Sequence, residues 1–133
     1  MTRILLVDDD DGLRRVLAQA LTQQGFDVQE ATNGNEALAC YDRQGADIVI
    51  LDVVMPEKEG LETIVELRRR PVIPGIIVMS GGGQISPKIY LKIAKAHRAD
   101  RVLEKPFSCE DLLDAVAEVE KLVGIGNTMR PNS

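Results

Sequence analysis

The sequence is poor in the residues that build zinc sites and His–Cys catalytic dyads. His97 is its only histidine, and its two cysteines, Cys40 and Cys109, have no metal-binding spacing. A zinc site needs several such ligands close together, and a catalytic dyad needs a histidine beside its thiol. Both kinds of site are therefore disfavoured.

Long apolar runs are also missing. The longest have only four or five residues, as in residues 4–7, whereas a membrane-spanning helix needs about 20. The first three residues lead straight into a short apolar run and then four aspartates, which is not the pattern of a secretion signal. We therefore expect a cytoplasmic protein with reduced cysteines and no membrane association.

Positive charge is in the minority, with 16 basic against 21 acidic residues and a net charge of −5. Domains that bind nucleic acids usually carry an excess of basic residues, so we expect no direct contact with nucleic acid. The three consecutive glycines at 81–83 are not followed by Gly-Lys-Ser or Gly-Lys-Thr. This argues against a phosphate loop for a nucleotide.

The chain does have the size and patterning of one α/β domain. It has 133 residues, and short apolar runs alternate with longer amphipathic stretches about five times. The predicted strands are residues 4–7, 26–30, 48–51, 76–79 and 102–103. Three of them are continuous aliphatic runs, which are typical of parallel strands buried on both faces.

The stretches between and after these strands have the amphipathic pattern of helices, each with a start or stop signal. The signals are Gly25 after the first helix, Asn33 before the second, Pro71 after the third (60–70), Ser86-Pro87 before the fourth, and Ser108 with Asp111 at the start of the fifth. Five β–α units in this order predict a parallel sheet covered by helices on both faces. Ligands of such sheets bind beyond the carboxyl ends of the strands.

Charged and hydroxyl side chains stand just after these predicted strands. Asp8 and Asp9 follow the first strand, Asp52 the third and Ser80 the fourth, and Lys105 closely follows the fifth. Three carboxylates at one edge need a compensating cation, and Mg²⁺ prefers oxygen ligands while keeping several waters. The set suits phosphoryl transfer to Asp52, with the metal and the lysine stabilising negative charge.

Other charged residues near this edge can be interpreted without a role in the site. Asp10 and Asp11 complete the acidic run, and we interpret them as a solvated turn. Arg14 and Arg15 lie beside the predicted site on the first helix. For these two arginines, contact with a phosphodonor protein and ordinary surface charge are equally good interpretations.

Four motifs at these positions together resemble the receiver domain of bacterial two-component response regulators, the CheY-like superfamily. They are Ile4-Leu5-Leu6-Val7-Asp8-Asp9, Leu51-Asp52 with Met55-Pro56 and Gly60, Val78-Met79-Ser80-Gly81, and Lys105-Pro106-Phe107. The resemblance implies a flavodoxin-like (βα)5 fold, a three-layer sandwich with parallel strand order 2-1-3-4-5. It implies a receiver domain at 1–123 and a flexible tail at 124–133, and we expect the receiver to stand alone.

The resemblance assigns the acidic residues. It implies that Asp52 is the phosphoacceptor and that Mg²⁺, for which Mn²⁺ can substitute, is bound by Asp8, Asp9, Asp52 and the backbone carbonyl of Val54. It also implies a switch hydroxyl on Ser80.

The resemblance makes Lys105 the phosphoryl-binding cation, held by a cis peptide bond to Pro106. The family usually has an aromatic residue three positions before this lysine, where the present chain has Val102.

The implied function is a phosphoacceptor switch rather than an enzyme, although it catalyses its own Mg²⁺-dependent phosphorylation and dephosphorylation. Its phosphodonor would be a histidine kinase or histidine phosphotransfer protein. Its output would be a protein target bound at the surface of the fourth helix, fifth strand and fifth helix. One alternative is a pseudo-receiver, an interaction module independent of phosphorylation. Val102 and altered loop lengths favour it slightly, but the intact set of site residues argues more strongly against it: Asp8, Asp9, Asp52, Ser80 and Lys105. A phosphatase with an aspartyl-phosphate is a further alternative, but it usually has a second aspartate where this chain has Val54.

Overall fold

The computed structural model describes residues 1–53, 60–80 and 99–124. Its strands are β1 (Arg3–Val7), β2 (Asp27–Ala31), β3 (Ile48–Asp52), β4 (Gly75–Ser80) and β5 (Arg101–Glu104). Its helices are α1 (Asp11–Gln23), α2 (Gly34–Gln44), α3 (Gly60–Leu67) and α5 (Cys109–Val123). The predicted fourth helix and the predicted tail beyond Gly124 lie outside the described residues. Among the described helices, none is long and apolar enough to cross a membrane.

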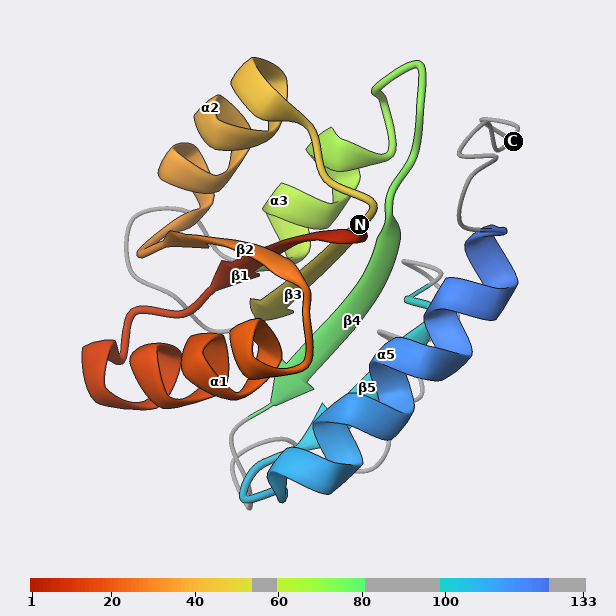
Figure 1. The fold of residues 1–133 in the computed structure, drawn as a ribbon. Coiled ribbons are helices and arrows are strands. Elements are labelled where there is room, and N and C mark those ends of the chain that lie inside the picture. Colours follow the sequence, from red (N-terminus) through yellow and green to blue (C-terminus); the bar gives the residue numbers. More distant parts are fainter. Residues whose placement is uncertain (54–59, 81–98, 125–133) are drawn as a thin grey trace.

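The five strands form one sheet in the order β2-β1-β3-β4-β5, and all neighbouring pairs are parallel (Figure 1). The inner strands β3 and β4 are buried along their whole length, whereas the edge strand β2 is mostly half-exposed. This burial follows the sequence, because the inner strands are continuous aliphatic runs. The strand order and fold class predicted above are confirmed.

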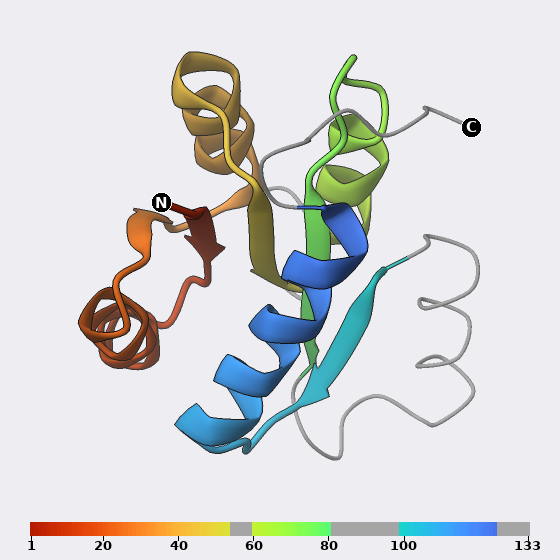
Figure 2. The ribbon, with the colours of Figure 1, turned by 45° about the vertical axis from the view of Figure 1, so that its right-hand side comes forward.

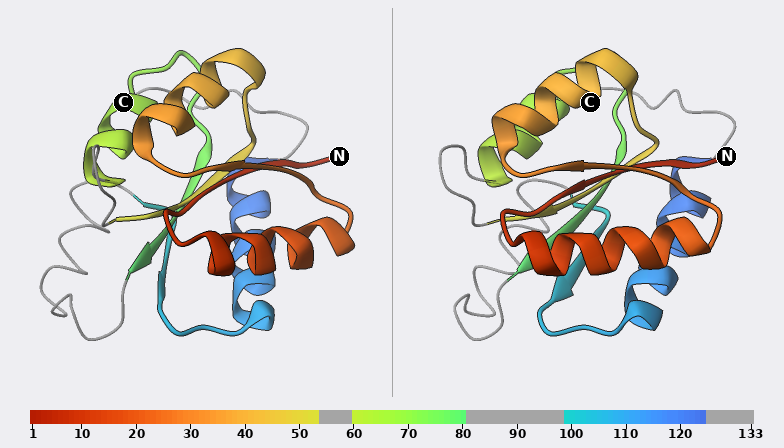
Figure 3. Two further views of the ribbon diagram at one scale, coloured as in Figure 1. Left: turned by 90° about the vertical axis from the view of Figure 1, so that its left-hand side faces the viewer. Right: turned by 60° about the vertical axis from the view of Figure 1, so that its left-hand side comes forward.

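The described elements form three layers (Figure 3). Helices α1 and α5 cover one face of the sheet and helices α2 and α3 cover the other. Each face has its own apolar core, one built on Ile4, Leu6 and Ile50 and the other on Leu5, Val49 and Leu51. The alternation of these residues between the two cores is the two-residue period of a strand. Helix α5 packs against β4 and β5 (Figure 2).

The helix signals are largely confirmed. The Asn33 side chain accepts a hydrogen bond from the N–H of Glu36 at the start of α2. Ser108 and Asp111 form a capping box at the start of α5. Helix α3 ends at Leu67, earlier than the predicted 70, because the following residues close tighter turns: Arg70 N–H donates to the Leu67 carbonyl at 3.1 Å.

Candidate functional site

Two aspartates lie side by side at the carboxyl edge of the sheet. Val7 of β1 is paired in register with Leu51 of β3, so the next residues along the two parallel strands are Asp8 and Asp52. Both side chains are buried, with residue exposures of 0% and 7%. Buried carboxylates are stable only with a positive charge or hydrogen-bond donors close by.

Lys105 supplies that positive charge from the other side of the site. Its Nζ atom lies 2.7 Å from Oδ2 of Asp52 and 3.0 Å from Oδ2 of Asp8. Its backbone N–H donates to the Ser80 carbonyl at 2.8 Å, and its peptide bond to Pro106 is cis, as the resemblance implied. Burial would lower the pKa of Lys105, but the hydrogen bonds to Asp52 and Asp8 raise it above its ordinary value.

The third carboxylate, Asp9, completes an acidic cluster. One carboxylate oxygen from each of Asp8, Asp9 and Asp52 lies within 4.8 Å of the others. Partial burial of its carboxyl group raises the pKa of Asp9, and the charges of Asp8 and Asp52 act in the same direction. Three oxygen donors that repel one another suit a hard divalent cation such as Mg²⁺. The predicted backbone ligand, the carbonyl of Val54, lies outside the described residues.

Ser80 ends β4 at the same edge of the sheet. It is fully buried, and within the described part of the chain its hydroxyl oxygen has no hydrogen-bond partner. A buried hydroxyl without a partner costs about 1–3 kcal/mol. Such a group fits a site that receives an additional oxygen-rich ligand, and phosphate oxygens are suitable acceptors.

Gly60 packs closely beside Asp52, a contact that the sequence indicated only through the motif containing this glycine. A Cβ atom there would lie 2.3 Å from the backbone oxygen of Asp52 and 2.6 Å from Cα of Val53. The Gly60 N–H also donates to the Val53 carbonyl at 3.1 Å. The start of α3 is therefore packed directly on the backbone that carries Asp52. Glycine inside the motif was the only available signal, since this close approach depends on tertiary packing.

Two earlier interpretations need correction. Asp10 is the N-cap of α1, and its side chain accepts a hydrogen bond from Leu13 N–H at 3.1 Å, so it does more than occupy a solvated turn. Arg14 is not ordinary surface charge, because it is buried and its Nη1 atom donates to the Asp8 carbonyl at 2.9 Å. Asp11 is exposed and forms an ion pair with Arg14. Arg15 is exposed, as ordinary surface charge would be.

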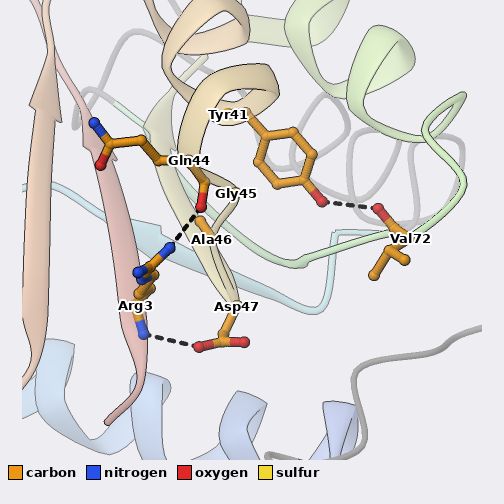
Figure 4. Close-up of a pocket in the computed structure, with 7 residues that line it drawn as sticks. All are labelled: Arg3, Tyr41, Gln44, Gly45, Ala46, Asp47 and Val72. Atoms are coloured by element: carbon orange, nitrogen blue, oxygen red, sulfur yellow. Dashed lines mark hydrogen bonds between the residues drawn. The ribbon is translucent and has the colours of Figure 1, made fainter.

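A different hollow lies where the strands begin (Figure 4). It has a volume of about 280 Å³ and includes Arg3, Tyr41 and Asp47 in its lining. Its polar groups bond one another: Asp47 accepts from the Arg3 N–H at 2.8 Å, and the Tyr41 hydroxyl donates to the Val72 carbonyl at 2.8 Å. These groups are satisfied within the protein, so the acidic edge is the better candidate site.

An open parallel sheet in this order, with clustered carboxylates and a lysine beyond its strand ends, places the chain among the flavodoxin-like α/β domains that bind ligands at the carboxyl edge. Residues 4–117 match the family model described as response regulator receiver domain. The chain therefore belongs to the response regulator receiver family. Receiver domains are phosphoacceptor switches rather than enzymes in the ordinary sense.

Two curated relatives illustrate the sequence similarity. The sensory transduction protein RegX3 of Mycobacterium tuberculosis is 35% identical over 119 residues, which cover 90% of this chain and 51% of the relative. The transcriptional regulatory protein CpxR of Klebsiella pneumoniae is 36% identical over 119 residues, covering 90% of this chain and 49% of CpxR. The chain thus spans about half the length of the curated relatives that it matches.

Solved structures agree with the fold. The chemotaxis response regulator CheY4 of Vibrio cholerae is 30% identical with a TM-score of 0.75, and the match covers 90% of this chain and 98% of that one. The receiver domain of a LuxO repressor protein from Vibrio parahaemolyticus gives a TM-score of 0.86 at 21% identity, covering 95% of both chains. The second similarity is evidence for the fold alone.

Proposed function

We propose that this domain accepts a phosphoryl group on Asp52 in a Mg²⁺-dependent reaction, with the ion held by Asp8, Asp9, Asp52 and the backbone carbonyl of Val54. The observation that carries the proposal is the Lys105 ammonium, which lies within 3.0 Å of carboxylate oxygens of both Asp8 and Asp52. This arrangement unites a nucleophile, a cation and a cluster of metal-binding oxygens at one edge of the sheet.

The chain's own residues have defined roles in this reaction. A carboxylate oxygen of Asp52 forms a bond to phosphorus while the bond from phosphorus to the donor breaks, and the donor leaves with the bonding electron pair. The Lys105 ammonium pairs with an oxygen of the transferred group, and the Ser80 hydroxyl donates to another. When bound, Mg²⁺ supplies positive charge that offsets the negative charge of the phosphoryl oxygens.

We propose a histidine kinase or histidine phosphotransfer protein as the phosphodonor. The output would be a protein target that binds differently to the phosphorylated domain, at the surface of the predicted fourth helix, β5 and α5. The predicted fourth helix lies outside the described residues. The net charge of −5 favours protein contacts over direct contacts with nucleic acid. A cytoplasmic location without membrane contact is part of the same proposal.

The test is intact-mass spectrometry after incubation with acetyl phosphate, with Mg²⁺ or with EDTA. We expect one phosphoryl increment on the wild-type protein that requires Mg²⁺ and is lost in Asp52→Asn. The matched control is Asp42→Asn, because Asp42 pairs with Arg70 on the molecular surface away from the acidic edge. We expect this control to be phosphorylated like the wild type.

A different result would favour the pseudo-receiver. If the wild-type protein gained no increment under conditions that label another receiver domain, the proposed phosphotransfer would be wrong. The domain would then act through contacts that do not depend on phosphate, and Val102, which stands where an aromatic residue is usual, would be consistent with that loss of switching.

A further inference from the structure

Arg14 is the one buried basic residue in the part of the chain that the structure describes, with 6% of its surface exposed. Removing a guanidinium from water is costly unless its donors are satisfied. Its Nη1 atom donates to the backbone carbonyl of Asp8 at 2.9 Å, and its Nε atom donates to Oε1 of Glu30 at 3.0 Å. Nη1 also lies 2.7 Å from Oδ1 of Asp11. One side chain thus joins the carboxyl ends of β1 and β2 to α1.

The bond to the Asp8 carbonyl concerns the acidic site directly. That carbonyl belongs to the peptide unit between Asp8 and Asp9, two members of the carboxylate cluster. A peptide unit is planar, so holding its oxygen sets the direction in which the chain enters Asp9. On either side of this unit, Asp8 N–H donates to the Ala31 carbonyl at 3.1 Å and Asp10 N–H donates to Oδ1 of Asp8 at 2.9 Å. Arg14 therefore fixes the Asp8–Asp9 peptide unit, and the hydrogen bonds of the Asp8 and Asp10 N–H groups fix the backbone on either side of it.

The carboxylate partners of Arg14 do not by themselves explain its burial. The side chain of Asp11 is 71% exposed and that of Glu30 is 39% exposed, and ion pairs with exposed partners contribute little to stability. Burial would lower the pKa of Arg14, but the hydrogen bonds to Asp11 and Glu30 raise it, which keeps the guanidinium charged. The exposed carboxylates of Asp11 and Glu30 thus keep the buried guanidinium charged, while its Nη1 atom contacts the backbone carbonyl of Asp8.

We propose that Arg14 is a positioning residue for the cation site: it orients the Asp8–Asp9 peptide unit so that both carboxylates face the same divalent ion. The inference rests on the function proposed above. It predicts that loss of Arg14 changes cation affinity in the direction opposite to that expected from charge alone. Removing a positive charge near the site should strengthen cation binding, whereas loss of positioning should weaken it.

The experiment measures Mn²⁺ affinity by EPR, which detects the free ion, on metal-free protein at temperatures where it is folded. The variants are Arg14→Met, which removes the charge, and Arg14→Lys, which keeps the charge but has no fork of donors to span two acceptors. The matched controls are Arg70→Met and Arg70→Lys. Arg70 donates to both oxygens of Asp42 at 2.9 Å, away from the acidic edge. Asp9→Asn serves as the reference for a lost ligand.

We expect both Arg14 variants to weaken Mn²⁺ binding by about 10-fold, the usual effect of removing a group that orients a metal ligand, while the Arg70 variants bind like the wild type. Unchanged binding in folded Arg14→Lys, or tighter binding in Arg14→Met, would overturn the inference and leave Arg14 a purely structural residue. If Arg14→Met does not fold, Arg14→Lys alone decides. Failure of the wild-type protein to bind Mn²⁺ would instead refute the proposed function, and this inference with it.

Discussion

One ammonium group faces three carboxylates at the acidic edge. Lys105 pairs with Asp8 and Asp52, and Asp9 belongs to the same cluster of oxygens. The remaining negative charge is what a divalent cation would neutralise. In the absence of metal this repulsion weakens the fold, so the proposed function of this edge conflicts with stability.

Asp9→Asn should therefore stabilise the metal-free protein at neutral pH. Because the folded state raises the pKa of Asp9 above its ordinary value of 3.8, protonation of Asp9 favours folding. That stabilisation is complete below pH 3.8 and is lost as the pH rises through the folded-state pKa. Asparagine stays neutral, so its advantage should be present at pH 7 and vanish below pH 3.8. Thermal unfolding in EDTA measures it, and a lower unfolding temperature for the variant at pH 7 would contradict the prediction.

Gly60→Ala should disturb Asp52, the proposed phosphoacceptor, without changing a charged group. The new Cβ would lie 2.3 Å from the backbone oxygen of Asp52, so that backbone must move. We expect a loss of about 1–3 kcal/mol in the free energy of unfolding, typical of overpacking, and slower phosphorylation by acetyl phosphate. Gly12→Ala is the control, because its Cβ meets Oδ1 of Asp10 at an ordinary 3.5 Å. Equal phosphorylation rates in the two variants would show that the Gly60 contact does not position Asp52.

At the scale of the elements, the starts of α2 and α5 were the most predictable features. Asn33 and Ser108 cap their helices because short polar side chains can reach the exposed N–H groups of the first turn. The contact between α5 and β4 could not be foreseen, since it joins residues far apart in the chain. There Gly75 leaves space for Val119 and Val123, whose Cγ1 atoms would lie 2.4 and 3.0 Å from a Cβ at position 75.

Gly75→Ala should therefore destabilise the fold by about 1–3 kcal/mol through overpacking, as measured by urea unfolding. Gly75 begins β4, whereas Ser80 ends it, so the folded variant should be phosphorylated at the wild-type rate. Val119→Ala removes the clashing methyl group, and its cost should be smaller in the Gly75→Ala variant than in the wild type. If the losses in the free energy of unfolding from the two substitutions simply added, α5 would have moved away from the new methyl group instead of clashing with it.

At the scale of the whole molecule, the meeting of Asp8, Asp52 and Lys105 at one edge was predictable from the residues, whereas the strand order was implied by the resemblance to receiver domains. Aliphatic runs identify parallel strands, and residues after such strands share an edge. The burial of Arg14 was not predictable, because its helical position beside exposed Asp11 resembles any surface arginine. Only the pairing of β2 beside β1 brings Glu30 within reach of it.

Strand boundaries were also imprecise. Strand β2 runs from Asp27 to Ala31 rather than over 26–30. Its mixed composition lacks a continuous apolar run, so its ends are set by pairing with β1. The same long-range pairing joins the N–H of Asp8 to the Ala31 carbonyl. Local sequence patterns therefore could not predict the contacts that link one β–α unit to the next.

The most direct test of the central claim is to locate the phosphoryl group. Borohydride reduces an aspartyl phosphate to homoserine, and peptide mass spectrometry then identifies the altered residue. After incubation with acetyl phosphate and Mg²⁺, we predict homoserine at position 52 and none at Asp8 or Asp9. Homoserine at another aspartate, or none anywhere in protein that carries the phosphoryl increment, would contradict the assignment of Asp52 as the phosphoacceptor.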